Sequence, residues 1–350
     1  MRFLAFGLVV LLLALVGRVA MVLIPIAGFF RDLPETDLSA CEAVTIAPGT
    51  EDVDIDPVLN VAFISAADRR TQNGLSDKNG IYAMALDGSK SIRRVSPDGF
   101  GPFAPHGISL WRSKDGDARL FVINHQPTSG GTTRQIVEIF DIKSDASLSH
   151  LQSVSFPEMY SPNDVVGVSA TQFYATNDRR FRDGLGALAE LYLGLPLADV
   201  AYWNGSAGSI AAKHFVYTNG INVSHDGGTV YVAELLNQTV HAYDRDAATG
   251  ALSHKKAYPV DTNPDNLDID QNGLIWIGGH PKALEFQAHA ADPAVISPSQ
   301  VMTLDPASGA TETVLTALKG ELNGSATGAV WDDTLIVGAV FEDRVLVCDL

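Results

Sequence analysis

The sequence predicts an all-β fold, a six-bladed β-propeller whose blades surround a central tunnel. The first observation is a repeat, because six units with one pattern begin near residues 51, 105, 162, 219, 264 and 325. Their spacing of about 50 residues is typical of propeller blades. The second is composition, since 31 Gly, 17 Pro and abundant Val, Ile and Thr indicate many short strands joined by turns. Beyond the N-terminus, no long amphipathic helix dominates the chain.

Each unit contains its own strand and turn signals. A polar residue beside a small turn residue precedes a short apolar stretch, which a Gly- or Asp-rich turn separates from an alternating strand. Residues 230–235 show the period-2 alternation of a strand. DGG at 226–228 and QNG at 271–273 match hairpin turns. Blades closed into a ring leave no long free edge, so we expect one domain over residues 41–350.

One segment departs from the repeats. Residues 181–203 place Leu, Ala and Tyr at helical spacing, which predicts a helical insertion packed over one mouth of the ring. Such a stretch is more often a lid or a core helix than a membrane anchor.

Residues 1–30 form an apolar N-terminal segment in which only Arg18 is charged after residue 2. The segment is long enough to span a bilayer, which takes about 20 residues. Because the apolar character resumes after Arg18 and no A-x-A site follows, we favour an uncleaved signal anchor, with a linker at 31–40. A cleaved signal peptide is the alternative. Both interpretations send the repeats into the secretory pathway, either membrane-anchored and facing the extracellular, lumenal or periplasmic side, or secreted.

The two cysteines lie at the ends of the repeats, Cys41 before the first unit and Cys348 in the last strand. A propeller is usually closed by pairing its two chain ends in one blade, so we expect a disulfide between them, which a secretory compartment permits. Closing so long a loop would stabilise the fold by roughly 4 to 5 kcal/mol in the chain-entropy model. Two unpaired thiols are the alternative. The same compartment makes four sequons candidate glycosylation sites, at Asn204, Asn222, Asn237 and Asn323.

The charge balance excludes two classes of protein. Asp and Glu outnumber Lys and Arg by 41 to 24, which gives a formal net charge of −17. Nucleic-acid binding is not expected, because neutralising phosphates takes a basic surface. A charged fraction of 19% beside 46% hydrophobic residues also excludes a disordered polyelectrolyte. Nothing in the sequence indicates an oligomeric state.

Polar residues recur at one position of the repeat, just before the apolar strand of each unit. They are Glu51–Asp52, His106, Asn163–Asp164, Asn219, Asp265–Asn266 and Thr327. The innermost strand of every propeller blade starts near the axis, so these positions converge. Buried polar groups need a shared partner, because their desolvation is otherwise costly. Carboxylate and amide oxygens are calcium ligands, whereas zinc calls for His and Cys, so the pattern predicts a calcium site.

Two points qualify this interpretation. Neighbouring residues of a strand point in opposite directions, so each doublet could serve two ions. A single Asn or Asp more commonly caps a turn, and only the shared register favours the metal.

The segments 52–57 and 268–273 resemble EF-hand loops but lack the bidentate Glu at position 12, so they are turns. The sequence has no nucleophile elbow, C-x-x-C, Walker loop or H-E-x-x-H, which argues against serine-hydrolase and zinc chemistry.

Ordered motifs across nearly the whole chain resemble the paraoxonase/arylesterase family of calcium-dependent lactonases and esterases. They include GTEDVDI, FAPHGIS, VINHQ, SPNDVV, NGINVSHDG, PDNLDID, IWIGGHP and the terminal VCDL. The resemblance implies a six-bladed propeller with two calcium ions in its tunnel. It also implies a carboxylic ester hydrolase whose substrates are small-molecule lactones or aryl esters.

The family's site residues transfer by position in these motifs. The resemblance implies an upper, catalytic ion held by Glu51, Asn163, Asn219, Asp265 and Asn266. It implies a deeper, structural ion held by Asp52, Asp164 and the backbone carbonyl of Ile108. His106 and His125 match the family's proposed histidine dyad, Cys41 and Cys348 match its disulfide, and Tyr217, His280 and Thr327 fall where it lines the substrate pocket. Gly279 stands where the family has a further free cysteine, so the resemblance implies no role for a thiol in this chain.

These residues lead to a hypothesis for catalysis. The upper calcium polarises the carbonyl, and either His106, oriented by His125, or a metal-bound carboxylate, Glu51 or Asp265, activates water. Two other functions stay open: a non-enzymatic propeller that binds a ligand at its mouth, and a sugar-lactonase of the broader propeller hydrolase group. The two histidines together with a complete set of upper-ion ligands favour the ester hydrolase.

Overall fold

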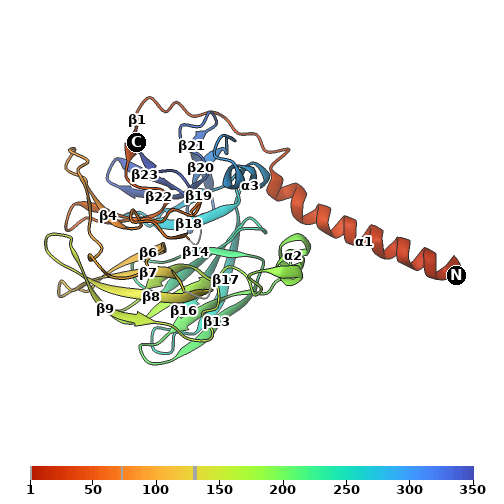
Figure 1. The fold of residues 1–350 in the computed structure, drawn as a ribbon, viewed down its shortest axis with the longest axis horizontal. Coiled ribbons are helices and arrows are strands. Elements are labelled where there is room, and N and C mark those ends of the chain that lie inside the picture. The colour runs from red at the N-terminus through yellow and green to blue at the C-terminus, as the bar shows by residue number, and fades with distance from the viewer. Residues whose placement is uncertain (1, 72–73, 129–131) are drawn as a thin grey trace.

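The structure, a computed structural model, describes residues 2–71, 74–128 and 132–350. Its six four-stranded antiparallel sheets confirm the predicted six-bladed propeller (Figure 1). The innermost strands of neighbouring blades are in contact all the way round, and the last of them contacts the first. The polar ends of these strands therefore surround one axis.

The first three blades each run outward from the axis in chain order. The first blade has β2 (Thr50–Asp56), β3 (Val61–Ala66), β4 (Gly80–Ala85) and β5 (Ile92–Arg94). The second has β6 (Pro105–Arg112), β7 (Ala118–Pro127), β8 (Thr133–Ile142) and β9 (Leu148–Val154). The third has β10 (Pro162–Gly167), β11 (Phe173–Asn177), β12 (Ala198–Trp203) and β13 (Gly208–Phe215). Their first strands begin at the predicted unit starts.

The next two blades repeat this order, and the sixth closes the ring. The fourth blade has β14 (Thr218–Val223), β15 (Thr229–Glu234), β16 (Thr239–Arg245) and β17 (Leu252–Pro259). The fifth has β18 (Pro264–Ile269), β19 (Ile275–Gly279), β20 (Ser299–Leu304) and β21 (Thr311–Ala317). The sixth has β22 (Ser325–Trp331), β23 (Thr334–Ala339), β24 (Arg344–Asp349) and, from the other end of the chain, β1 (Cys41–Thr45).

The two chain ends pair in this sixth blade. β1 runs antiparallel to β24, and the register places Cys41 opposite Cys348. The two residues form a disulfide with their Cα atoms 4.0 Å apart, across a sequence separation of 307 residues. The predicted ring closure is confirmed, and the described residues contain no free cysteine.

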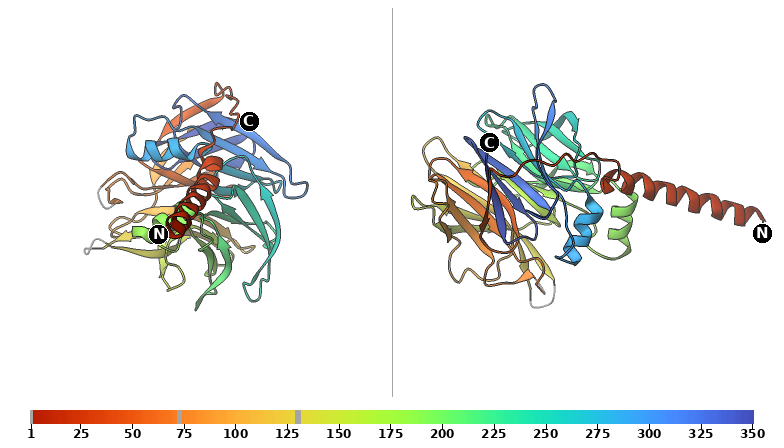
Figure 2. Two further views of the ribbon diagram at one scale, coloured as in Figure 1. Left: turned by 90° about the vertical axis from the view of Figure 1, so that its right-hand side faces the viewer. Right: turned by 90° about the horizontal axis from the view of Figure 1, so that it is seen from above.

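Three helices gather on one side of the ring (Figure 2). They are α1 (Arg2–Ala27), α2 (Gly184–Leu193) and α3 (Ala283–Ala291), and α1 contacts both of the others. The insertion expected over 181–203 is helical only in α2, because residues 198–203 pair with β11 and β13 as strand β12. Helix α3 was not predicted from the sequence. In Figure 1, the N-terminal part of α1 projects away from the propeller.

The hydrophobic core is divided into layers between neighbouring blades. One layer joins Phe121 and Ile123 of the second blade to Phe173 and Ala175 of the third. Another joins Tyr231 and Ala233 of the fourth blade to the fifth blade. Each sheet is therefore buried on both faces, and burial of this apolar area holds the ring together. The ring in turn fixes the inner strands that carry the polar residues.

Candidate active site

Every innermost strand is irregular at the same place. The pairing of each with its neighbour shifts register just after the first residue of the strand, as between Pro162 and Val165 of β10. Such bulges redirect side chains and are frequent beside active sites. The residues inside the shifts include Glu51, His106, Asn163, Asp164, Asn219, Asp265 and Asn266. The predicted polar residues therefore lie in β-bulges, which allow the side chains of adjacent residues to face the same tunnel.

Two glycines follow these polar residues because neighbouring inner strands approach closely. A Cβ atom on Gly107 would lie 2.3 Å from Asp164 Oδ1, and one on Gly220 would lie 2.5 Å from the backbone oxygen of Asp265. Any side chain there would push adjacent blades apart. The HG and NG pairs of the sequence thus reflect packing around the tunnel.

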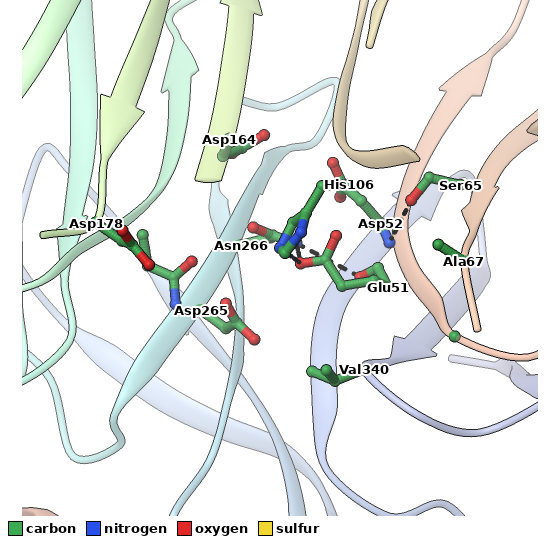
Figure 3. A network of polar contacts seen from close by, with 12 residues as sticks. Glu51, Asp52, Ser65, Ala67, His106, Asp164, Asp178, Asp265, Asn266 and Val340 are labelled. Atoms are coloured by element: carbon green, nitrogen blue, oxygen red, sulfur yellow. Dashed lines mark hydrogen bonds and ion pairs between the residues drawn. The ribbon is translucent and has the colours of Figure 1, made fainter. Parts of the chain in front are cut away.

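Five oxygen-bearing residues meet at the upper end of the tunnel, and Figure 3 shows Glu51, Asp265 and Asn266 among them. All five are at most 9% exposed, and they are Glu51, Asn163, Asn219, Asp265 and Asn266. Asn266 Nδ2 donates a hydrogen bond to Glu51 Oε1 at 2.9 Å, which orients both side chains. Four buried oxygens accept no hydrogen bond from the described residues: Glu51 Oε2, Asn163 Oδ1, Asn219 Oδ1 and Asn266 Oδ1. Buried acceptors left without donors are costly, so this cluster is suited to a cation.

A second pair of carboxylates, Asp52 and Asp164, is tied to the backbone of neighbouring blades. Asp52 Oδ2 accepts the N–H of Ile108 at 2.7 Å, and Asp164 Oδ2 accepts the N–H of Ile221 at 2.8 Å. Each side chain therefore joins its blade to the next one. The contact found for Ile108 uses its amide nitrogen, so ligation through its carbonyl stays a prediction.

The electrostatics of these carboxylates also favour a cation. Burial raises the pKa of Glu51 and of Asp265. The pKa of Asp52 is raised well above its usual value by burial and then by the charges of Asp164 and Glu51. Burial likewise raises the pKa of Asp164 well above its usual value. Holding several carboxylates ionised in one buried site takes compensating positive charge.

Arg69, which was not predicted as a site residue, supplies one compensating charge. Its side chain is 17% exposed, and Nη2 lies 3.8 Å from Glu51 Oε2. Nη1 donates to the backbone oxygens of Gly49, Ala67 and Val340, at 3.1, 3.2 and 3.3 Å. Arg69 thereby joins the first and sixth blades beside Glu51. No motif marked it, because it follows β3 rather than beginning an inner strand.

The two predicted histidines form a hydrogen-bonded pair at the edge of this cluster. His125 Nε2 and His106 Nδ1 are 3.1 Å apart, and His106 Nε2 lies 3.5 Å from Glu51 Oε1. Burial lowers the pKa of both imidazoles well below the usual value, and the charge of Arg69 lowers that of His106 further. Both rings are therefore neutral near pH 7.

A cavity of about 340 Å³ lies over the cluster. Its polar lining includes Glu51, His106, Asn163, Asn219, Asp265 and two of the predicted pocket residues, Tyr217 and His280. His280 Nε2 lies 2.8 Å from Asp265 Oδ2, and the imidazole stacks on Phe286 of α3 with ring centroids 3.8 Å apart. Thr327 differs from the expectation, because it is 1% exposed and does not line this cavity.

The apolar wall of the cavity comes from all three helices and neighbouring strands. It includes Ile26 of α1, Leu191 of α2, Ala283 and Phe286 of α3, and Leu235 and Leu236 after β15. Ile26 is 2% exposed and packs with Val216, Leu236 and Ala283. These residues were not predicted, since an apolar side chain in a helix gives no sequence signal for a substrate wall.

The four sequons differ in accessibility. Asn204 and Asn237 are exposed, so both remain candidate glycosylation sites. Asn323 is 8% exposed, and its amide donates to Glu342 Oε1 and accepts the N–H of Ser297. Asn222 Nδ2 donates to the backbone oxygen of Leu267 inside the opposite end of the tunnel. Glycosylation of the folded chain at Asn222 or Asn323 would break these contacts.

Comparison with known proteins matches this architecture. The sequence profile of the Arylesterase family matches residues 34–350. The chain belongs to the arylesterase family. Serum paraoxonase/arylesterase 2 of Gallus gallus is 36% identical over 91% of both chains, and that of Homo sapiens is 32% identical over 100% of this chain and 99% of its own. A solved luciferin-regenerating enzyme has a TM-score of 0.57 at 12% identity, covering 89% of this chain and 95% of its own, and shares the fold.

Membership of the arylesterase family confirms the predicted class of enzyme, a carboxylic ester hydrolase with arylesterase and lactonase activity. The relatives are named as serum enzymes, and the apolar α1 together with the disulfide agrees with a secretory route. Among the described residues, one helix, over Phe6–Ala27, is long and apolar enough to cross a membrane.

Proposed function

We propose that this arylesterase-family chain hydrolyses lipophilic lactones and aryl esters in the cavity over the upper cluster, with calcium as its cofactor. The observation that carries the proposal is the set of four buried oxygens without hydrogen-bond donors, on Glu51, Asn163, Asn219 and Asn266. They lie beside the histidine pair and under an apolar wall. A cavity with these neighbours suits a bound ester better than a macromolecular partner.

The residues of the cluster fit calcium by their chemistry. All their donor atoms are carboxylate or amide oxygens, which a hard cation such as calcium prefers. Glu51, Asn163, Asn219, Asp265 and Asn266 would hold a catalytic ion, and Asp52, Asp164 and the carbonyl of Ile108 a structural one. When bound, the upper calcium polarises the substrate carbonyl and stabilises negative charge on its oxygen.

The side chains of the cluster would position the ester and move the proton of the attacking water. Water attacks the carbonyl carbon, and its proton goes to His106 or to a carboxylate, Glu51 or Asp265. Asn266 holds Glu51 in place through the hydrogen bond at 2.9 Å, and His280 holds Asp265 at 2.8 Å. The apolar wall excludes water from the acyl or alkyl part of the substrate.

The helices on this side of the ring support a lipophilic substrate delivered from a membrane. The first half of α1 is exposed, with Phe3, Phe6 and Leu11 between 67% and 94% exposed. On α2, Leu185 is 85% exposed. The helices that carry these apolar side chains lie on the side of the ring where the cavity opens, and the side chains would enter a bilayer. The proposed topology therefore anchors α1 and turns the cavity toward the lipid.

A panel of lactones and aryl esters, measured with and without EDTA, tests the proposed function. We expect hydrolysis of hydrophobic lactones that EDTA abolishes and added calcium restores. Full activity after removal of calcium would contradict the calcium mechanism. Preference for sugar lactones would favour the sugar-lactonase alternative, and no hydrolysis of any ester would favour a non-enzymatic binding module.

A further inference from the structure

Gln135 lies on β8 beside His125 of the histidine pair and is 7% exposed. One end of its amide is 2.6 Å from His125 Nδ1, and the other end faces the guanidinium of Arg182. A guanidinium carries only donors, so the amide oxygen must be the end that faces Arg182. In that orientation the oxygen accepts from Arg182 Nη1 and, at 3.2 Å, from Nη2. The amide nitrogen then donates to His125 Nδ1 at 2.6 Å.

This orientation determines where the protons of both histidines lie. His125 Nδ1 accepts a hydrogen bond, so it is bare and the ring carries its proton on Nε2. That proton points at His106 Nδ1, 3.1 Å away, which must therefore be bare as well. His106 then carries its own proton on Nε2, the atom that lies 3.5 Å from Glu51 Oε1. This assignment assumes only that each imidazole ring keeps at least one proton, so that a ring with one bare nitrogen carries its proton on the other.

We propose that Gln135, held by Arg182, fixes His106 and His125 in the tautomer with the proton on Nε2, so that the N–H of His106 points toward Glu51 and the cavity. Gln135 is thus a positioning residue, and Arg182 orients it from the exposed end of the chain of hydrogen bonds. The role in catalysis rests on the proposed ester hydrolysis, whereas the tautomer itself does not.

The consequence for catalysis is that neutral His106 has no free lone pair for the proton of water. In the hydrolysis the water oxygen bonds to the carbonyl carbon, and the water proton moves to a carboxylate oxygen of Glu51 or Asp265. The ester C–O bond breaks, and the same proton passes to the departing alkoxide. His106 Nε2–H orients Glu51 or the substrate during these steps. Of the two candidate bases, the inference selects the carboxylate.

Nitrogen NMR of the full-length protein labelled with ¹⁵N-histidine tests the tautomer directly, because bare and protonated ring nitrogens differ widely in chemical shift. His106→Gln and His125→Gln variants assign the signals. We expect bare Nδ1 and protonated Nε2 on both rings. Gln135→Glu should reverse both, because a carboxylate accepts from His125 Nδ1–H, and His125 Nε2 then accepts from His106 Nδ1–H. A wild-type pair protonated on Nδ1, or a Gln135→Glu pair unchanged from wild type, would overturn the proposal.

A second pair of variants keeps the test valid if Gln135→Glu does not fold. Arg182 is exposed, and Arg182→Gln should release the amide so that signals of both tautomers appear. Arg180→Gln is the matched control, since the Arg180 guanidinium stacks over Tyr160, 4.5 Å from the ring centroid, and lines a different pocket from the one that His106, His125 and Arg182 share. Gln126→Leu is the matched amide control, because Gln126 Oε1 accepts from Arg134 at 3.3 Å. Both controls should keep the wild-type tautomer.

Kinetic measurements then show whether His106 acts as a hydrogen-bond donor or as a general base. Gln retains a side-chain N–H donor, so His106→Gln should lower kcat by less than about tenfold, whereas removal of a general base costs about 100-fold or more. His106→Phe, which has no N–H donor in its side chain, should lower kcat more than His106→Gln does. An equally large loss in both variants would assign the base to His106 and contradict the inference. If the wild-type protein hydrolyses no ester, the proposed function fails, while the NMR result still decides the tautomer.

Discussion

Asn266 and Glu51 connect the fifth and first blades across the tunnel, where Asn266 Nδ2 donates to Glu51 Oε1 at 2.9 Å although 215 residues separate them. The bond occupies the nitrogen of the amide and one oxygen of the carboxylate. The two oxygens left over, Asn266 Oδ1 and Glu51 Oε2, are both buried without a donor. The arrangement thus presents acceptors in a fixed direction, which is the requirement for a preorganised cation site.

The first prediction concerns the proposed ligands of the catalytic calcium ion. Asn219→Ala and Asp265→Ala should each weaken calcium binding by about tenfold or more and lower kcat/KM by about 100-fold or more, because each removes an oxygen from the cluster. Titration with a calcium chelator and ester kinetics measure the two effects. Asn272→Ala is the matched control, as Asn272 lies exposed on the β18–β19 turn. Unchanged calcium affinity in Asp265→Ala would remove Asp265 from the ligand set.

The second prediction is a pH dependence of calcium binding. Burial raises the pKa of Glu51, Asp52, Asp164 and Asp265, so the calcium-free protein holds protons on this cluster at pH values where exposed carboxylates have none. Calcium must displace these protons, and its apparent affinity should therefore rise as the pH rises. Calorimetry in two buffers of different ionisation enthalpy should detect proton release. Equal calcium affinity at pH 6 and pH 8 would contradict the predicted pH dependence.

The third prediction separates the two halves of α1. Arg18 Nε donates to the backbone oxygen of Leu193 at 2.6 Å, which fastens α1 to the end of α2. Asn263 Nδ2 donates to the backbone oxygen of Ile26 at 2.8 Å and also to that of His280, the partner of Asp265. Deleting residues 2–31 should therefore lower kcat/KM on a soluble ester by about tenfold or more, because it opens the cavity and loosens the side chains at its floor.

Two further variants control this experiment. Deleting residues 2–17 removes only the exposed part of α1 and should change kcat/KM on the soluble ester by less than about twofold, while it weakens binding to lipid vesicles. Arg18→Leu should lower kcat/KM on the soluble ester by an amount between the effects of the two deletions. Equal activity of both deletion variants would show that Ile26 and the segment around it have no part in the cavity.

The fourth prediction concerns ring closure. Replacing Cys41 and Cys348 by Ser should lower the free energy of unfolding by roughly 4 to 5 kcal/mol, since the disulfide closes a loop of more than 300 residues. Urea unfolding measures the loss. Activity at low temperature should persist, because β1 and β24 are the two strands of the sixth blade farthest from the axis. An unchanged urea midpoint would mean that the β1–β24 pairing alone closes the ring.

Much of this protein could be predicted from sequence because its information is local and repeated. Each blade needs the same short strands and turns, so the unit starts follow from the spacing alone. Glu51, Asn163, Asn219 and Asp265 share one repeat position, and every blade places that position at the axis. Cys41 and Cys348 flank the repeats, so their pairing followed from ring closure.

The tertiary structure decided what depends on contacts between blades. Bulges at the inner strands turn the predicted residues into one cluster, and Arg69 joins that cluster from a loop without a motif. Ile26 and Phe286 became walls of the cavity because α1 and α3 pack over the tunnel, and α3 itself was not predicted. The proton positions of His106 depend on Gln135 and Arg182, which lie 29 and 76 residues further along the chain. No local pattern records such contacts, because only the closed ring brings these side chains within hydrogen-bonding distance.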